Sequence, residues 1–180
     1  MEAVRRREPE ALGRLFDRHF AAVFALVFRL LGDRAAAEDV TQEVFLKVYN
    51  AAHRLDPERD PGPWLTTIAT NACRDVWRSG AHRMARRSTP VDDDPEAGVT
   101  LTSGVNEPER DALAAERERL VQQALGQLPE ALRVPIVLHD YQGLSHPEIA
   151  EVLGVNPAAA RKRYSRALAA LAALLKETLG

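Results

Sequence analysis

Apolar side chains recur every three to four residues along most of the chain, which is the spacing of amphipathic helices. The strict alternation of apolar and polar residues that is typical of β-strands is absent. We therefore predict an all-α protein. Helices are expected at residues 8–31, as one kinked helix or two short ones, and at 35–52, 64–78, 110–125 and 130–139, with two more after residue 144.

The last quarter of the chain predicts two helices joined by a tight turn. Ser145 and Glu148 have the spacing of a capping box, so the first of these helices should begin at Ser145. Gly154 tolerates the left-handed conformation that commonly ends a helix. Asn156 and Pro157 supply a side-chain cap and a first-turn proline for the second helix. This arrangement is typical of a helix-turn-helix.

The second helix of this pair carries a basic cluster. Lys162 and Arg166 fall near the centre of its polar face, and Arg161 and Arg163 lie on the flanks. An ordinary solvated face is one interpretation. The coincidence with the caps and the turn favours DNA binding, with the flanking arginines on phosphates and the central residues on base edges.

The polar side of the predicted 35–52 helix contains one apolar residue among charges. Leu46 could be a lone exposed leucine, which is common, or part of a surface that binds another protein. The pattern alone leaves both interpretations open. The residues on this side are Asp39, Gln42, Glu43, Leu46 and Lys47.

The predicted 64–78 helix presents amide, guanidinium and indole groups opposite its apolar side. Such a mixture suits single-stranded nucleic acid, where arginines contact phosphates and an aromatic ring stacks on an unpaired base. Alternatively, Trp77 packs into the core and the polar groups face water. The residues concerned are Asn71, Arg74, Trp77 and Arg78.

Charge changes sign abruptly in the middle of the chain. The net charge of -2 is close to neutral, so positive charge must be localised if nucleic acid is the partner. Residues 88–109 contain prolines and acidic residues but no lysine or arginine, which is typical of a flexible acidic linker. We therefore predict two small helical domains, 1–87 and 110–180, joined by that linker.

Catalytic and metal-binding patterns are missing from the sequence. Cys73 is the single cysteine, and the histidines have no metal-ligand spacing, so we expect no metal, no cofactor and no disulfide. His139, Asp140 and Tyr141 could suggest acid–base chemistry, but a surface cluster at a helix end explains them better. We expect a cytoplasmic protein that is not an enzyme, takes no small-molecule substrate and does not insert into a membrane.

Two blocks of the sequence resemble a known family. AAAEDVTQEVFLKVYNAAHRLDP with PWLTTIATNACRDVWR resembles region 2 of bacterial sigma factors of the extracytoplasmic-function (ECF) group, within the sigma-70 family. LPEALRVPIVLHDYQGLSHPEIAEVLGVNPAAARKRYSRAL resembles region 4 of the same factors. The resemblance implies two helical domains and promoter-specific transcription initiation with core RNA polymerase.

The resemblance also implies roles for the residues named above. The 35–52 face would bind the clamp coiled coil of the polymerase β′ subunit. The loop 56–61 and the 64–78 face would capture an unpaired base of the promoter -10 element. The basic helix would read the -35 element as duplex. Further implied partners are the polymerase β flap and an anti-sigma factor.

Two other function classes stay open from the residues alone. A stand-alone helix-turn-helix regulator would bind duplex DNA tightly without polymerase. An enzyme of unrecognised type would need a pocket with converging titratable groups, and the sequence displays none.

Overall fold

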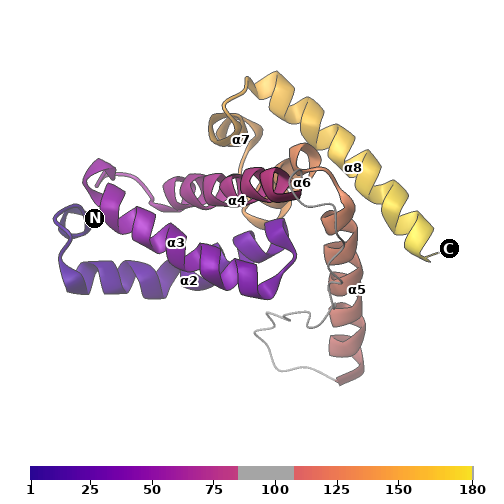
Figure 1. Cartoon of the computed structure of the whole chain (residues 1–180), viewed down its shortest axis with the longest axis horizontal. Helices are drawn as coiled ribbons and strands as arrows, with labels where there is room; N and C mark the ends of the chain where they lie inside the picture. Colours follow the sequence, from indigo (N-terminus) through magenta and orange to yellow (C-terminus); the bar gives the residue numbers. More distant parts are fainter. Residues whose placement is uncertain (85–107, 180) are drawn as a thin grey trace.

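The computed structural model describes residues 1–84 and 108–179, and this part of the chain folds into helices without β-strands (Figure 1). The predicted all-α class is confirmed. Residues 88–107 of the predicted linker lie outside the described residues. The elements are α1 (Glu2–Arg5), α2 (Pro9–Leu31), α3 (Arg34–Ala51), η1 (Ala52–Arg54), α4 (Gly62–Met84), α5 (Pro108–Gln127), α6 (Glu130–Ile136), η2 (Val137–Tyr141), α7 (His146–Leu153) and α8 (Pro157–Leu179).

Helices α2, α3 and α4 pack together through aliphatic side chains that are almost wholly buried, among them Val27, Leu30 and Val44. The 8–31 segment is a single helix, which ends at Gly32 in the left-handed conformation (φ 77°). The Asp33 side chain then accepts a hydrogen bond from the backbone of Ala36 at 2.6 Å and so begins α3. These two caps explain the sharp reversal between α2 and α3.

Helix α4 continues past residue 78 to Met84, so it is longer than its apolar pattern predicted. The segment beyond residue 78 includes Ser79 and Gly80, which have low helix propensity. The hydroxyl of Ser79 instead donates to the carbonyl oxygen of Val76 at 2.9 Å and stays within the helix. The predicted helix is therefore too short, but the assignment of its residues to apolar and polar faces is unchanged.

The helix-turn-helix is confirmed by its caps. The backbone N–H of Ser145 donates to Glu148 at 2.8 Å, and the Ser145 hydroxyl accepts from the Glu148 backbone, which completes the capping box. Gly154 is left-handed (φ 65°), and Asn156 accepts from the backbone of Ala159 at 2.8 Å. The hydrogen bonds from Ser145 lower the pKa of Glu148, so this stabilisation is lost as pH falls through the lowered pKa.

The predicted 130–139 helix is interrupted by a π turn. Pro135 lies inside α6 and lacks the N–H that an α-helix needs. The chain then widens into the π turn of η2, over Val137–Tyr141. Leu138 remains fully buried there, and its carbonyl oxygen accepts from the backbone of Leu144 at 3.0 Å.

The N-terminal and C-terminal helices pack against one another. In Figure 1, helix α4 lies between the α2–α3 pair and helices α7 and α8, whereas α5 runs past the end of the pair. Helix α7 contacts α4, and helices α5 and α6 both contact α2. Buried apolar side chains form one continuous cluster from Val4 to Ala167. The sequence analysis did not anticipate this packing.

Candidate nucleic-acid interface

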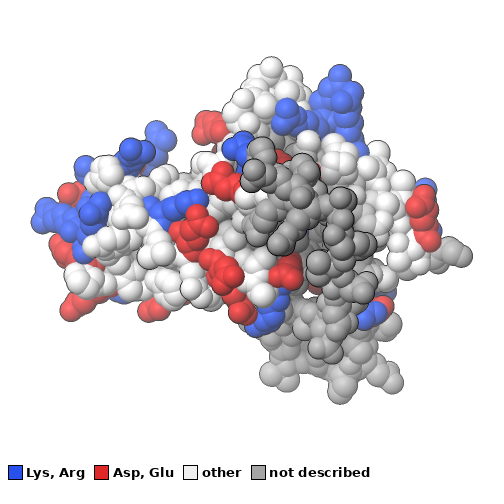
Figure 2. Space-filling model, in the orientation of Figure 1, with Lys and Arg blue, Asp and Glu red and all other residues white. Residues whose placement is uncertain are grey.

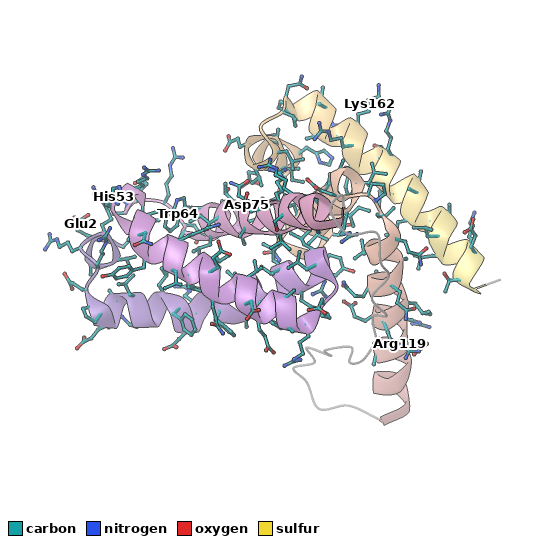
Figure 3. All side chains as sticks on the ribbon, in the orientation of Figure 1. Glu2, His53, Trp64, Asp75, Arg119 and Lys162 are labelled. Carbon is teal, nitrogen blue, oxygen red and sulfur yellow. The ribbon has the colours of Figure 1, made fainter. Side chains whose placement is uncertain are left out.

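The basic cluster on α8 points away from the core. Ala160 and Ala167 are fully buried on the opposite side of the helix. Arg161, Lys162 and Arg166 are exposed. Lys162 projects outward in Figure 3, and basic side chains gather at that edge in Figure 2. The predicted arrangement of the polar face is therefore present for these three residues.

Arg163 differs from its neighbours because it is half-buried. It faces the N-terminal helices closely enough for its charge to contribute to a lowered pKa of Arg74 on α4, after the larger effect of burial. The sequence places Arg163 on a flank of the helix, and the structure turns that flank toward α4.

The four predicted strand-binding residues of α4 do not form one open surface. Asn71 and Arg78 are exposed, whereas Arg74 and Trp77 are half-buried. One Arg74 nitrogen lies 3.3 Å from Asn71 Oδ1 and 3.4 Å from the carbonyl oxygen of Val152 on α7. Trp77 packs against the apolar cluster, as the alternative interpretation of that residue predicted.

A hollow of about 540 Å³ separates the predicted base-capture loop from α7. Trp64 stands at the start of α4 (Figure 3) and lines this hollow. Sequence reasoning did not single out Trp64 as functional, although a tryptophan directly after a proline-rich loop is a usable signal. The lining includes Arg54, Asp56, Arg59, Trp64, Leu144 and Glu148.

The predicted protein-binding face of α3 is open. Leu46 is 66% exposed, the largest value among the exposed large apolar residues of the described chain. Asp39, Gln42 and Glu43 are exposed beside it. The ammonium group of Lys47 lies 2.8 Å from Glu43 and 3.4 Å from Asp75 on α4, and hydrogen bonds to these carboxylates raise the pKa of Lys47.

An aromatic group extends this face toward α2, which the sequence analysis missed. Phe16 is 41% exposed, and its ring centroid lies 4.7 Å from that of Phe45, the neighbour of Leu46. Phe20 lies 4.9 Å from Phe16 by the same measure. The signal was available, because Phe16, Phe20 and Phe24 are spaced four residues apart along α2.

Comparison with known proteins identifies the family. Residues 15–89 match the model for sigma-70 region 2, and residues 118–171 match the model for sigma-70 region 4. The chain is 31% identical to the RNA polymerase sigma-H factor of Pseudomonas aeruginosa, over 99% of this chain and 93% of that protein. The chain belongs to the ECF group of the sigma-70 family.

Other relatives support the assignment of this sigma factor to the ECF group. It is 30% identical to the ECF RNA polymerase sigma-E factor of Haemophilus influenzae, covering 93% of this chain and 88% of the relative. The solved structure of CnrH in complex with the cytosolic domain of CnrY is 28% identical, with a TM-score of 0.66 over 98% of this chain and 94% of that one. Promoter-directed transcription initiation is therefore the function, and a stand-alone helix-turn-helix regulator is not favoured.

The histidine cluster of the sigma factor, His139 and His146, lies where η2 approaches the start of α7. Nδ1 of His139 lies 2.7 Å from the carbonyl oxygen of Leu144, and the His139 and His146 ring centroids are 4.8 Å apart. The Tyr164 hydroxyl donates to Asp140 at 2.7 Å. Desolvation and this hydrogen bond raise the pKa of Tyr164 to about 12. These contacts hold α8 against η2 and α7, which agrees with a packing role.

Within residues 1–84 and 108–179, no three His, Cys, Asp or Glu side chains come together as a possible metal site. Over the same ranges, no helix combines the length and apolarity needed to span a membrane.

Cys73 should be inert in the native sigma factor. It is fully buried in α4, and burial raises the pKa of its thiol to about 12. Only about one thiol in ten thousand would be ionised at pH 8. We expect iodoacetamide to leave Cys73 unmodified in the folded chain and to alkylate it rapidly in guanidinium chloride, as measured by intact mass.

A matched control places a cysteine on the surface, as in Ser165→Cys on α8, where residue 165 is exposed. That variant should gain one label under native conditions. Alkylation of the native wild-type chain at the rate of the control would contradict the burial of Cys73.

Proposed function

We propose that three helices of this sigma factor divide the work of promoter recognition. The exposed face of α3 binds the clamp coiled coil of the polymerase β′ subunit. Helix α4 and the loop before it grip the melted -10 element, and α8 reads the -35 element as duplex. The observation that carries this proposal is the exposure of a basic cluster on α8 and of Leu46 among polar residues on α3, two helices that lie apart in Figure 1.

The α3 face has the composition of a protein-binding site. A single exposed apolar residue surrounded by polar groups resembles an interface anchor inside a polar rim. Leu46 supplies the anchor, and the rim consists of Asp39, Gln42, Glu43 and Lys47. Phe16 and Phe45 would widen the apolar contact.

The α8 cluster supports duplex readout. Its first turn carries Ala158, which is exposed and small, so the backbone of the helix start can approach a groove closely. Lys162 and Arg166 are the candidates for base edges, and Arg161 and Arg163 are the candidates for phosphates.

The α4 surface supports strand capture without bond chemistry. Opening a DNA base-pair step costs about 1–2 kcal/mol, and stacking one base on an aromatic side chain recovers about 1–3 kcal/mol. Asn71, Arg74, Trp77 and Arg78 on α4, with the hollow beside Trp64, offer the required groups. A few such contacts are enough to favour melting.

The proposal includes the remaining expectations from the sequence. Residues 1–87 would form the -10 domain, 88–109 the linker and 110–180 the -35 domain, which would also contact the β flap. The protein would act in the cytoplasm and be held by an anti-sigma factor. The likeness to CnrH, solved with the cytosolic domain of CnrY, supports such a partner.

Reconstituted transcription tests this function. The purified chain is mixed with bacterial core RNA polymerase and a library of promoter fragments, and the transcripts are sequenced. We expect transcripts from a small set of fragments that share two conserved blocks. Transcripts that are independent of the chain, or tight binding of the chain alone to a palindromic duplex, would refute it.

A further inference from the structure

Helix α1 of the sigma factor ends in a Schellman motif. The backbone N–H of Arg7 donates to the carbonyl oxygen of Val4 at 2.9 Å, and the next N–H, of Glu8, donates to a carbonyl oxygen one residue earlier at 3.0 Å. Arg7 is left-handed (φ 58°), the one residue other than glycine with a positive φ in the described part of the chain. Glycine is the usual residue at this position of the motif, because it has no Cβ. An arginine there is therefore unusual.

The Arg7 side chain joins this turn to the last turn of α3. Its guanidinium group donates to the carbonyl oxygen of Asn50 at 2.9 Å. Its guanidinium carbon also lies 5.1 Å from the centre of the Tyr49 ring, within the range of a cation–π contact. A positive charge is favourable at the C-terminal end of a helix, where the dipole is negative. These contacts, which glycine cannot make, account for an arginine at a left-handed position.

Apolar packing joins the same two segments. The Val4 side chain is only 4% exposed, and α1 contacts η1. Ala52 of η1 is fully buried, and Leu55 directly after η1 is buried as well. The N-terminal turn lies beside the end of α3 in Figure 1, and Glu2 and His53 lie at the same end of the molecule in Figure 3. We call this set of residues the N-terminal brace: Val4, Arg7, Tyr49 and Asn50.

The brace borders the predicted base-capture loop, residues 56–61. Helix η1 ends at Arg54, and Leu55 connects it to this loop. Most of the loop is exposed, but Leu55 before it and Pro61 at its end are buried. The loop is thus fixed at its two ends and open between them. The place of its first end depends on η1, and η1 packs against α1.

We propose that Val4 and Arg7 are positioning residues for promoter opening: they hold η1 in place, and η1 sets where the loop 56–61 meets the -10 element. This role rests on the proposed function of the loop. It goes beyond that function, because the proposed DNA contacts include neither Val4 nor Arg7.

Replacing Arg7 with glycine separates the side chain from the backbone. Glycine removes both side-chain contacts, whereas it fits the left-handed turn better than arginine does. If Arg7 served the turn alone, Arg7→Gly would leave the loop unchanged. We expect instead that the backbone amides of residues 55–62 exchange hydrogen about fivefold faster, as for the loss of one exposed hydrogen bond. Exchange is measured by mass spectrometry on the full chain.

Three further variants complete the series. Arg6→Ala removes the same charge from the neighbouring residue, whose side chain is 68% exposed, and should exchange like wild type. Arg7→Lys keeps a cationic donor for the carbonyl oxygen of Asn50 and should retain most of the protection. Val4→Ala removes part of the apolar contact and should loosen the loop by a second route.

Promoter opening is measured in the complex with core RNA polymerase, on a promoter obtained from the transcription library. Permanganate oxidises unpaired thymines and so reports melting of the -10 element, whereas DNase I footprinting reports occupancy of the -35 element. Arg7→Gly should lower permanganate reactivity about twofold to fivefold, the larger value applying if displaced loops predominate without the brace. The -35 footprint should be unchanged.

The outcomes separate the brace from the function of the loop. Wild-type exchange in Arg7→Gly would overturn the brace, and so would equally fast exchange in Arg6→Ala. If Val4→Ala is unfolded by circular dichroism, the comparison uses Arg7→Gly, which changes exposed contacts alone. A weaker -35 footprint would indicate general instability and overturn the positioning role. Faster exchange with unchanged permanganate reactivity would mean that the loop does not capture the -10 element, so the proposed function of the loop fails while the brace stands.

Discussion

Replacing Leu46 with alanine should weaken the binding of this sigma factor to core RNA polymerase by about thirtyfold or more. Central apolar anchors of protein interfaces contribute at least about 2 kcal/mol, which corresponds to that factor. Leu46 is 66% exposed, so its truncation should leave the fold intact. Binding is measured by competition with a labelled sigma factor for core polymerase, and folding by thermal denaturation.

The control for Leu46→Ala is Leu168→Ala on α8, which truncates a leucine that is 40% exposed and distant from α3. It should retain wild-type affinity for core polymerase in the same competition. If the two variants behave alike, Leu46 is an ordinary exposed leucine and the α3 face is not the docking site.

The double replacement Lys162→Ala and Arg166→Ala should reduce promoter-specific transcription by at least about thirtyfold. A good contact to a base edge contributes about 1–3 kcal/mol, and both side chains lie on the exposed face of α8. Binding to core polymerase should persist, because α3 is untouched. A run-off assay measures promoter-specific transcription, and competition with a labelled sigma factor measures binding to core polymerase.

Charge alone must be separated from readout in this experiment. The variant Arg117→Ala with Arg119→Ala removes the same charge from exposed positions on α5 and should retain most of the transcription. The Lys162 and Arg166 variant should also show a shallower dependence on salt, if either side chain contacts phosphate. Loss of core binding in that variant would contradict the division of work between α3 and α8.

The parts of this fold that were predictable from sequence depend on short-range rules. The capping box at Ser145 and Glu148, the left-handed Gly154 and the Asn156 cap each involve residues within a few positions of one another. Their hydrogen bonds therefore depend mainly on the local sequence. The helix-turn-helix and the exposed side of α8 follow from them.

The exposure of the residues on the polar face of α4 was not predictable from such short-range rules. Asn71 and Arg78 are exposed as expected, but Arg74 reaches the carbonyl oxygen of a residue 78 positions away. Periodicity assigns a residue to a face of its own helix and says nothing about what later covers that face. Trp77 is covered for the same reason, because Arg133, whose guanidinium carbon lies 5.8 Å from the centre of the Trp77 ring, belongs to a helix on the other side of the linker.

Helix length was the other point at which local rules fell short. The apolar pattern placed the end of α4 at residue 78, but the helix continues through Ser79 and Gly80 despite their low propensity. Propensity differences amount to less than about 1 kcal/mol per residue, so packing overrides them readily. The predicted 130–139 helix also ran through Pro135, and the π turn that follows this proline has no simple sequence signal.

That π turn restricts insertions and deletions in this part of the chain. A π turn closes its backbone hydrogen bonds over five residues, whereas an α-helix closes them over four. Deleting one residue between Val137 and Tyr141 would remove that extra residue and move every later position relative to α6. Leu144, now 7% exposed, would leave the core. Related chains should therefore vary in the identity of these residues far more readily than in their number.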